Sequence, residues 1–354
     1  MVTDGPGGLP NDPAARAVAA VPGAPLTMRA LVTGASGFAG SNLCRTLRAR
    51  DWQVRAIARS TSQVDALREA GVEIVAGDIR DPAAVRAAMP GVDVVFHLAA
   101  IFREAGKSDA EYHAVNLDGT RHAIEAAAAA GVSRFVHCST VGVHGDTGAV
   151  PANEESPLVE ATDSYNRTKL AAERWAREAF GRLGLAGTIV RPTSGYGPGE
   201  RRYVKLFSGI AHGRFLMIGS GATRMNLAYV DDLCEGMLLA ATHPKAVGET
   251  FVLGGDENVA IADLARRIAA IVGGSPWRVR VPAWPVVAAA VTCEALCRPL
   301  GIEPPLHRRR VGFFTVQRAF DISKAKRVLG YRPRVALDDG LRATADWYRA
   351  QGLL

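Results

Sequence analysis

A glycine-rich turn, Thr33-Gly34-Ala35-Ser36-Gly37-Phe38-Ala39-Gly40, constrains the fold of this chain more than any other segment. It follows an apolar run and opens a segment with helical periodicity. Gly34 suits the tight turn, Gly37 lets the backbone approach a pyrophosphate, and Gly40 lets helix and strand pack closely. The first N–H groups of the helix provide an anion-binding end. Strand, glycine turn and helix together predict a dinucleotide site.

Short β-branched runs alternate with longer segments of helical periodicity from Met28 onward. Strands separated by helices imply right-handed βαβ crossovers and a parallel sheet covered on both faces. We therefore predict an α/β fold, a Rossmann-type doubly wound parallel sheet, with its ligand at the carboxyl ends of the strands. The predicted strands are 30–32, 54–58, 73–76, 92–97, 134–138 and 188–191, and the predicted helices are 41–50, 63–70, 82–88, 116–130 and 164–183.

After Arg191 glycine and proline become frequent and the regular alternation ends. This change predicts a second, smaller and mainly helical lobe that binds the substrate. We place the dinucleotide-binding domain at 28–195, with 226–254 returning to it, and the substrate lobe at 196–225 and 255–354. Residues 1–27 are rich in Gly, Pro, Ala and Asp without periodicity, and we expect a disordered extension there.

The 354-residue chain has a formal net charge of +7, carried mainly by scattered arginines, so we expect no nucleic-acid partner. Its five cysteines lack C-x-x-C or Cys/His ligand spacing, which predicts reduced thiols, no metal site and a location in the cytoplasm. The longest uncharged apolar stretch, Val281 to Cys293, is shorter than the roughly 20 residues that span a bilayer. We expect no transmembrane segment, and a peripheral membrane contact stays open.

Tyr165 and Lys169 stand one helical turn apart, so both project from one face of the predicted helix 164–183. An ammonium near a phenol favours the phenolate and lowers a pKa that is ordinarily about 10. Tyr165 would then serve as proton donor and acceptor near neutral pH. The alternative is a chance Tyr and Lys on an exposed amphipathic helix.

With these motifs the chain resembles the extended short-chain dehydrogenase/reductases, from Met28 to the C-terminus. Further motifs of that family follow in order and spacing. They are Gly77-Asp78-Ile79, His97-Leu98-Ala99-Ala100, Val115-Asn116-Leu117-Asp118-Gly119-Thr120, Ser139-Thr140 and Arg191-Pro192 through Gly197-Pro198.

The resemblance implies roles for the matching residues. Tyr165 would be the catalytic acid and base, Lys169 would bond the nicotinamide ribose, and Thr140 would hold the reacting oxygen, with Ser139 as the other candidate. Pro192 would border the nicotinamide. The residues expected to bind the cofactor are Gly34, Ser36, Gly37, Phe38, Gly40, Arg59, Asp78, Ile79, Ala99, Ala100, Asn116, Tyr165, Lys169 and Pro192.

The choice of cofactor depends on the end of the second predicted strand. An NAD-binding chain usually has Asp or Glu about 20 residues after the glycines, bonding the ribose 2′-hydroxyl. Here the segment Ala58-Arg59-Ser60-Thr61 has no acid, and Arg59 could pair with a 2′-phosphate. NADP(H) is therefore favoured and NAD(H) stays open, because Arg59 could also be an ordinary surface arginine.

Two branches of the family compete for the substrate. Nucleotide-sugar epimerases and reductases need cations for a diphosphate, and the arginine expected before Asn226-Leu227-Ala228-Tyr229-Val230-Asp231 is replaced by Met225, with Arg224 one residue away. The segment looks more like the 3β-hydroxysteroid dehydrogenase and sterol-4α-carboxylate 3-dehydrogenase branch. Long-chain 3-oxoacid reductases are also similar.

The apolar segment from Trp284 to Val291 would suit a bulky hydrophobic substrate if it lined a cleft, although such a run is also typical of a core helix. We therefore expect oxidation or reduction at a secondary alcohol or ketone of a sterol-like, terpenoid-like or long-chain 3-hydroxy or 3-oxo compound. A nucleotide-sugar 4-epimerase or reductase is the alternative. A regulator that only binds nucleotide is remote, because Tyr165 and Lys169 are both present. The resemblance also implies a homodimer through the helices 116–130 and 164–183.

Overall fold

The computed structural model describes residues 27–104, 106–161, 163–277, 279–297, 306 and 308–354. Apart from Thr27, the predicted N-terminal extension lies outside the described residues. Among the helices of these ranges, none combines the length and apolar character needed to cross a membrane.

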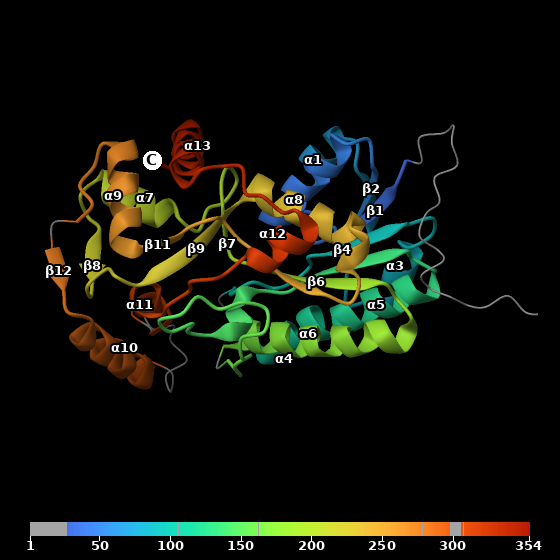
Figure 1. Ribbon diagram of the computed structural model, residues 1–354, viewed down its shortest axis with the longest axis horizontal. Helices are drawn as coiled ribbons and strands as arrows, with labels where there is room; N and C mark the ends of the chain where they lie inside the picture. Colours follow the sequence, from blue (N-terminus) through green and yellow to red (C-terminus); the bar gives the residue numbers. More distant parts are fainter. Residues whose placement is uncertain (1–26, 105, 162, 278, 298–305, 307) are drawn as a thin grey trace, which may run out of the picture.

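A seven-stranded sheet forms the centre of the larger lobe (Figure 1), and every pair of neighbouring strands in it is parallel. The strands lie in the order β10-β6-β5-β4-β1-β2-β3. From β1 the chain adds strands on one side up to β3 and then, starting with β4, on the other side, so the order of addition reverses between β1 and β4. This arrangement confirms the predicted doubly wound fold. The strands are β1 (Arg29–Thr33), β2 (Gln53–Ala58), β3 (Glu73–Ala76), β4 (Val94–His97), β5 (Arg134–Cys138), β6 (Gly187–Pro192) and β10 (Thr250–Leu253).

Helices cover both faces of this sheet because successive side chains of each buried strand point to opposite sides. Phe96 of β4 packs in one cluster with helices α1 (Phe38–Arg48) and α8 (Val230–Thr242). Its neighbour Val95 packs in a second cluster with the helices of the other face. Those helices are α3 (Pro82–Ala87), α5 (Gly119–Ala129) and α6 (Ser164–Leu183).

The second lobe lies at the left of Figure 1 and contains small sheets as well as the predicted helices. Its strands are β7 (Ser194–Tyr196), β9 (Arg224–Tyr229) and β11 (Asn258–Ala260) in one sheet, and β8 (Leu216–Ile218) and β12 (Val279–Val281) in another. Its helices are α7 (Val204–Ala211), α9 (Ile261–Val272), α10 (Ala283–Cys297), α11 (Arg308–Thr315) and α13 (Leu337–Ala350). The lobe boundaries drawn from the sequence stay predictions.

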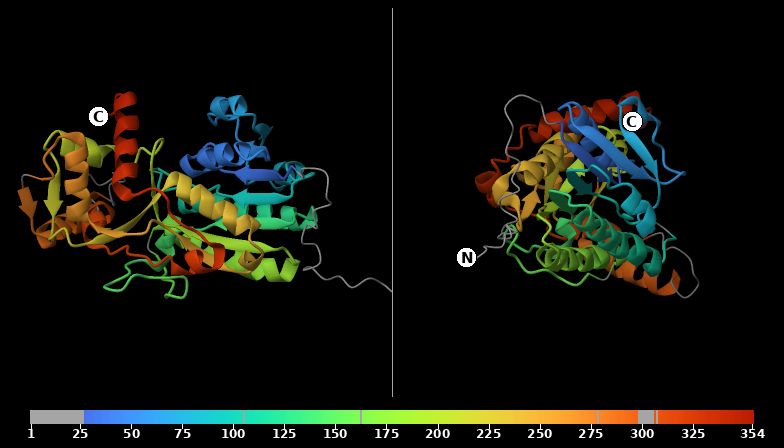
Figure 2. Two further views of the ribbon diagram at one scale, coloured as in Figure 1. Left: turned by 45° about the horizontal axis from the view of Figure 1, so that its top comes forward. Right: turned by 90° about the vertical axis from the view of Figure 1, so that its right-hand side faces the viewer.

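The remaining helices connect these layers. Helix α12 (Ser323–Leu329) contacts β10 and α8, so the chain returns to the larger lobe before it ends in α13 (Figure 2). A π-helical turn, η2 (His113–Asp118), joins α4 to α5 where the sequence predicted a single helix over 116–130. The other short helices are α2 (Asp65–Glu69), α4 (Asp109–Tyr112), η3 (Val141–His144) and η4 (Pro244–Ala246).

Candidate active site

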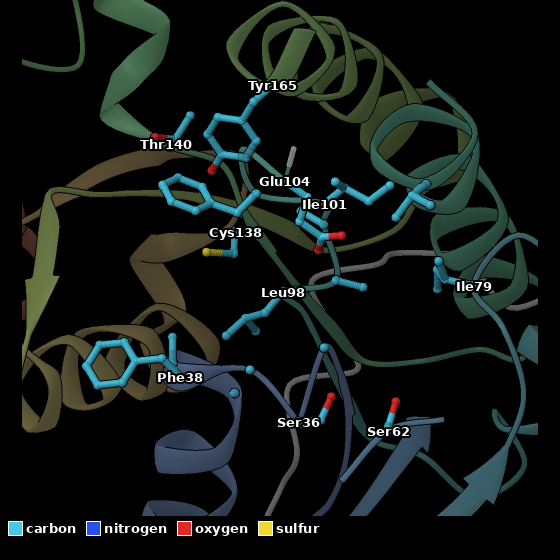
Figure 3. A pocket seen from close by; sticks show the side chains of 18 of the residues that line it. Ser36, Phe38, Ser62, Ile79, Leu98, Ile101, Glu104, Cys138, Thr140 and Tyr165 are labelled. Carbon is cyan, nitrogen blue, oxygen red and sulfur yellow. The ribbon is translucent and has the colours of Figure 1, made fainter. Parts of the chain in front are cut away.

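A cavity of about 620 Å³ runs along the carboxyl ends of β1, β2 and β4. Ser36 and Ser62 lie at one end of it and Thr140 and Tyr165 at the other (Figure 3). It therefore opens where the strand order reverses, the place at which doubly wound sheets bind ligands. The expected site residues that line it are Gly34, Ser36, Gly37, Phe38, Gly40, Arg59, Asp78, Ile79, Ala99, Ala100, Thr140, Tyr165 and Pro192.

The glycine turn is shaped so that side chains would not fit. Gly34 has a φ of 72°, and a Cβ there would meet the backbone N of Ala99 at 2.7 Å. A Cβ on Gly40 would lie 2.2 Å from the carbonyl oxygen of Gly34. Helix α1 begins directly after Gly37, whose missing side chain leaves the first N–H groups of the helix uncapped. The turn thus fits a pyrophosphate, as the sequence predicted.

The end of the cavity that lies beside β2 and Ser62, opposite Tyr165, carries positive charge. Arg59 is exposed at the end of β2 and has no ion pair within 4.0 Å among the described residues. Asp78 is engaged by Arg80, whose guanidinium lies 2.7 Å from its carboxylate, and this pair lowers the pKa of Asp78. Ser62 and Arg80 also line this end, although no motif in the sequence marked them. The end therefore presents the guanidinium groups of Arg59 and Arg80 and a hydroxyl, with the Asp78 carboxylate paired to Arg80.

At the other end, the side chains of Tyr165 and Thr140 lie next to each other (Figure 3), and Thr140 acts to lower the pKa of Tyr165. Asp163 caps α6 by accepting a hydrogen bond of 3.0 Å from the N–H of Asn166, which fixes the first turn that carries Tyr165. Thr140 also accepts from the N–H of Gly142 at 3.1 Å. The neighbouring Ser139 donates its hydroxyl to the carboxylate of Glu173 at 2.5 Å. Of the two candidate hydroxyls, that of Ser139 is thus bonded to Glu173, and the Thr140 side chain lies beside Tyr165 (Figure 3).

The pKa of Tyr165 differs in direction from the sequence expectation. Burial raises it from 10.0 to about 12, because the phenolate loses hydration in the cavity wall. The hydrogen bond to Thr140 and the charges of Arg103 and Arg202 act in the opposite direction. In the protein without cofactor, desolvation outweighs these groups, so Tyr165 is a phenol at neutral pH.

Lys169 and Asn116 do not line the cavity, in contrast to the other expected site residues. Lys169 is 2% exposed, and its Nζ donates to the carbonyl oxygen of Cys138 at 2.5 Å. Asn116 is fully buried; its Oδ1 accepts from the N–H of Ile101 at 2.8 Å, and its Nδ2 donates to the hydroxyl of Thr168 at 3.0 Å. Asn116 thus links the loop after β4 to helix α6 by hydrogen bonds, so it contributes to the site by holding the backbone of that loop in position.

Residues that no motif assigned surround Tyr165. The ring of Phe102 meets the ring of Tyr165 edge-on, with their centroids 4.8 Å apart. Arg103 and Arg202 lie over the Phe102 ring at 5.5 and 5.1 Å from its centroid. The sequence assigned no role to Phe102, Arg103 or Arg202, because their positions depend on how distant loops pack.

The structure corrects one expectation about the substrate side and shows how Arg224 and Met225 are placed. No residue of α10 lines the cavity, and Trp284 is 76% exposed, so the apolar run 284–291 is neither a pocket wall nor a buried core helix. Arg224 is exposed on β9 while Met225 is buried, so Arg224 does not take the place of an arginine at position 225. Adjacent residues of a strand face opposite sides, which accounts for this difference.

Known proteins resemble this chain in both sequence and fold. The chain is 31% identical to a 3 beta-hydroxysteroid dehydrogenase/Delta 5-->4-isomerase of Mycobacterium tuberculosis, over 90% of each chain. It is 33% identical to a 2-alkyl-3-oxoalkanoate reductase of Stenotrophomonas maltophilia, over 89% of this chain and 98% of that protein. The crystal structure of the dTDP-glucose 4,6-dehydratase DesIV of Streptomyces venezuelae, with NAD bound, superposes with a TM-score of 0.73 at 27% identity. That alignment covers 91% of this chain and 97% of DesIV.

The family model of the NAD dependent epimerase/dehydratase family matches residues 30–254, which include the glycine turn, Thr140 and Tyr165. With these motifs in place on a doubly wound sheet, the chain belongs to the NAD-dependent epimerase/dehydratase family and is an enzyme of the short-chain dehydrogenase/reductase type.

Proposed function

We propose that the protein interconverts a secondary alcohol and a ketone on a hydrophobic substrate, either sterol-like, terpenoid-like or a long-chain 3-hydroxy or 3-oxo compound. The placement of Tyr165 beside Thr140, in a cavity that continues to the glycine turn, is the observation that carries this proposal. The named activities of the 3 beta-hydroxysteroid dehydrogenase and the 2-alkyl-3-oxoalkanoate reductase support it, because both act at such a carbon.

We assign a separate role in the reaction to each residue of the site. When bound, the nicotinamide supplies the hydride acceptor or donor. Thr140 positions the reacting oxygen, and Tyr165 gives a proton to that oxygen during reduction or takes it during oxidation. The ammonium of Lys169, buried behind the cavity wall, binds the Cys138 carbonyl; we assign to it the ribose contact that would bring it beside the reacting groups.

Replacing Tyr165 by Phe tests the assignment of the acid. We expect turnover to fall by at least about a thousandfold, because the proton would have to come from water, while cofactor affinity changes little. Fluorescence titration with the reduced cofactor measures the second quantity on the same preparation. Substantial turnover by the Phe variant would refute the mechanism.

For the cofactor we propose NADP(H). Arg59 has no carboxylate partner among the described residues, and Arg80 already engages Asp78, so the adenosine end is cationic. A charge-assisted hydrogen bond to a 2′-phosphate contributes about 1.5–3 kcal/mol. Arg59→Ala should therefore weaken NADPH binding by roughly 10- to 100-fold and leave NADH binding nearly unchanged. Arg68→Ala, a nearby exposed arginine paired with Asp65, is the matched control.

A nucleotide-sugar epimerase or reductase is the second candidate. One solved structure of similar fold is a UDP-glucuronic acid 4-epimerase of Bacillus cereus, at 26% identity, and the arginines around Tyr165 could meet a negatively charged substrate. Binding of UDP-glucose to the NADP⁺-loaded enzyme, measured by calorimetry beside a long-chain secondary alcohol, separates the two candidates. The homodimer, the cytoplasmic location and a peripheral membrane contact stay predictions.

A further inference from the structure

The ring of Phe102 forms part of the cavity wall beside the reacting phenol. It meets the Tyr165 ring edge-on, with the ring centroids 4.8 Å apart and an angle of 83° between the ring planes. Both residues line the cavity, and Phe102 remains 38% exposed. The ring therefore presents an apolar surface to any group that lies next to Tyr165, and it limits the space available there.

Two guanidinium groups hold the Phe102 ring in this orientation. The guanidinium carbon of Arg202 lies 5.1 Å from the ring centroid, and that of Arg103 lies 5.5 Å from it. A cation within about 6 Å of an aromatic centroid is attracted by the ring, and the edge-on contact with Tyr165 is a favoured aromatic geometry. Arg103 directly follows Phe102 in the chain, whereas Arg202 comes from a distant segment. The orientation of the ring therefore depends on where Arg202 is held.

Glu200 fixes the guanidinium of Arg202. Its carboxylate accepts from the backbone N–H of Arg202 at 2.9 Å and from Nε of the same residue at 2.7 Å, and Nη2 lies 2.6 Å from it. Nη2 also donates to the carbonyl oxygen of Gly195 at 2.9 Å. Both Glu200 and Arg202 line the cavity. Several charge-assisted bonds between one carboxylate and one guanidinium define the geometry of the pair, unlike a single contact between exposed charges.

The C-terminal helix α13 supports the turn that carries this ion pair. The hydroxyl of Tyr348 donates to the backbone carbonyl oxygen of Glu200 at 2.6 Å, and Tyr348 is fully buried, with its ring edge-on to that of Phe207. The helix also packs closely on β7, because a Cβ on Gly340 would lie 2.3 Å from the hydroxyl oxygen of Tyr196. The turn after β7 is therefore held from the second lobe, while Phe102 belongs to the loop after β4 of the larger lobe.

We propose that Phe102 determines how wide a substrate can be beside its reacting carbon. Tyr348 is a positioning residue for this wall and acts through Glu200 and Arg202. The inference rests on the proposed function and specifies what surrounds the reacting carbon: an unbranched chain fits beside the fixed ring more easily than a fused ring system. Because the ring is held from both lobes, it does not move aside for a broad substrate unless these contacts break.

The test measures kcat/KM for two alcohols, the unbranched 2-decanol and the fused-ring 3β-hydroxysteroid epiandrosterone. Phe102→Ala should raise the ratio of kcat/KM for the steroid to that for 2-decanol by roughly tenfold or more, because removing a few carbon atoms from a pocket wall changes discrimination by roughly 10- to 200-fold. Tyr348→Phe keeps the buried ring and loses one hydrogen bond, so it should raise the same ratio by roughly two- to tenfold. The ratio does not depend on the fraction of folded enzyme, so a merely structural role would leave it unchanged.

Tyr331→Phe is the matched control for Tyr348→Phe. Tyr331 is also fully buried and donates its hydroxyl to a backbone carbonyl, that of Gly254 at 3.0 Å, and neither residue lines the cavity. Both variants should lower Tm by a similar amount, but Tyr331→Phe should leave the ratio of the two kcat/KM values unchanged. An equal change of the ratio in both variants would overturn the positioning role of Tyr348.

A double-mutant cycle shows whether Tyr348 acts through Arg202. Arg202→Met should raise the ratio as Tyr348→Phe does, and combining the two replacements should add little, because residues of one network have non-additive effects. Arg201→Met, an exposed arginine outside the cavity lining, should leave the ratio unchanged. Fully additive effects of the two replacements would refute the path through Arg202.

Calorimetry on the Tyr165→Phe variant loaded with NADP⁺ provides a readout without turnover. Adding Phe102→Ala or Tyr348→Phe should strengthen binding of epiandrosterone relative to that of 2-decanol. If neither alcohol binds or reacts, the proposed function fails, and a change in UDP-glucose affinity in both variants would still support the wall formed by Phe102. If replacing Phe102 changes the binding of none of the three ligands, the inference is refuted, whatever the fate of the proposed reaction.

Discussion

The hydroxyl of Ser139, directly after β5, donates to the carboxylate of Glu173 at 2.5 Å. The same carboxylate accepts two hydrogen bonds from Nε of Arg191, at 3.1 and 3.2 Å, and both side chains of this ion pair are 1% exposed. Ser139 is therefore bound into a buried polar network. Ser139 and the next residue, Thr140, both line the cavity, and the Thr140 side chain lies beside Tyr165 (Figure 3).

This relationship predicts that the Thr140 hydroxyl contributes to catalysis and the adjacent Ser139 hydroxyl to folding stability. Thr140→Val should lower kcat by about 100- to 1000-fold, the usual effect of removing one donor to the reacting oxygen, with little change in Tm. Ser139→Ala should leave kcat within a few-fold and lower the free energy of unfolding by about 1 kcal/mol. Steady-state kinetics and thermal unfolding of both variants check this. The reverse pattern would assign the catalytic hydroxyl to Ser139.

Removing the charge of Glu173 should destabilise the protein strongly. Glu173→Gln leaves Arg191 buried without a counter-ion, which costs about 3–5 kcal/mol in unfolding free energy at pH 7. The arginine and Ser139 hold the pKa of Glu173 below its usual value, so the stability it contributes is present above about pH 4.3 and is lost as the pH falls through the lowered pKa. Denaturant unfolding at several pH values measures both effects. Glu178→Gln, exposed on the same helix, is the control and should change little.

Two buried histidines should make the protein sensitive to mild acid. Burial lowers the pKa of His97 to about 3 and that of His137 well below 6.5, so both stay neutral in the folded state. The unfolded chain binds these protons below about pH 6.5, and folding stability should fall by about 1.4 kcal/mol per pH unit for each histidine. Neither nitrogen of His137 has a hydrogen-bond partner among the described residues, so His137→Phe should keep or raise stability at pH 7. It should also remove about half of the acid slope.

Unfolding of wild type and His137→Phe between pH 5 and 7 tests the effect, with His212→Gln, an exposed histidine, for comparison. An unchanged acid slope in His137→Phe would show that His137 titrates normally in the folded protein.

The raised pKa of Tyr165 should separate the two directions of the reaction. Reduction needs the phenol and should be constant through neutral pH, whereas oxidation needs the phenolate and should keep rising to at least about pH 9. The charge of Arg202 lowers this pKa, so Arg202→Met should move the oxidation profile to higher pH. Profiles of kcat/KM in both directions, with Arg201→Met as control, measure the shift. An oxidation profile that levels off below pH 8 would point to a strongly stabilised phenolate.

Local patterns allowed the fold to be predicted because they depend on neighbours in the chain. The predicted strands and helices of the larger lobe are present; strands β3 and β5 and helix α6 have the predicted bounds, and the ends of the others are shifted. The π-helical turn before α5 was not foreseen, because the side-chain bonds of Asn116 to Ile101 and Thr168 link parts of the chain that pack only in the fold. Helix α10 was misjudged because an apolar run alone does not say what covers it.

By itself the sequence determined the sheet, the glycine turn and the helix that carries Tyr165 and Lys169, since backbone sterics and helical periodicity fix these over a few residues. Tertiary structure alone decided that Ser139 turns to Glu173, that burial raises the pKa of Tyr165, and that Phe102 packs edge-on against the Tyr165 ring. Those properties depend on side chains from distant segments and on how much water their packing excludes. No local sequence pattern encodes which distant side chains meet or how much water their packing excludes.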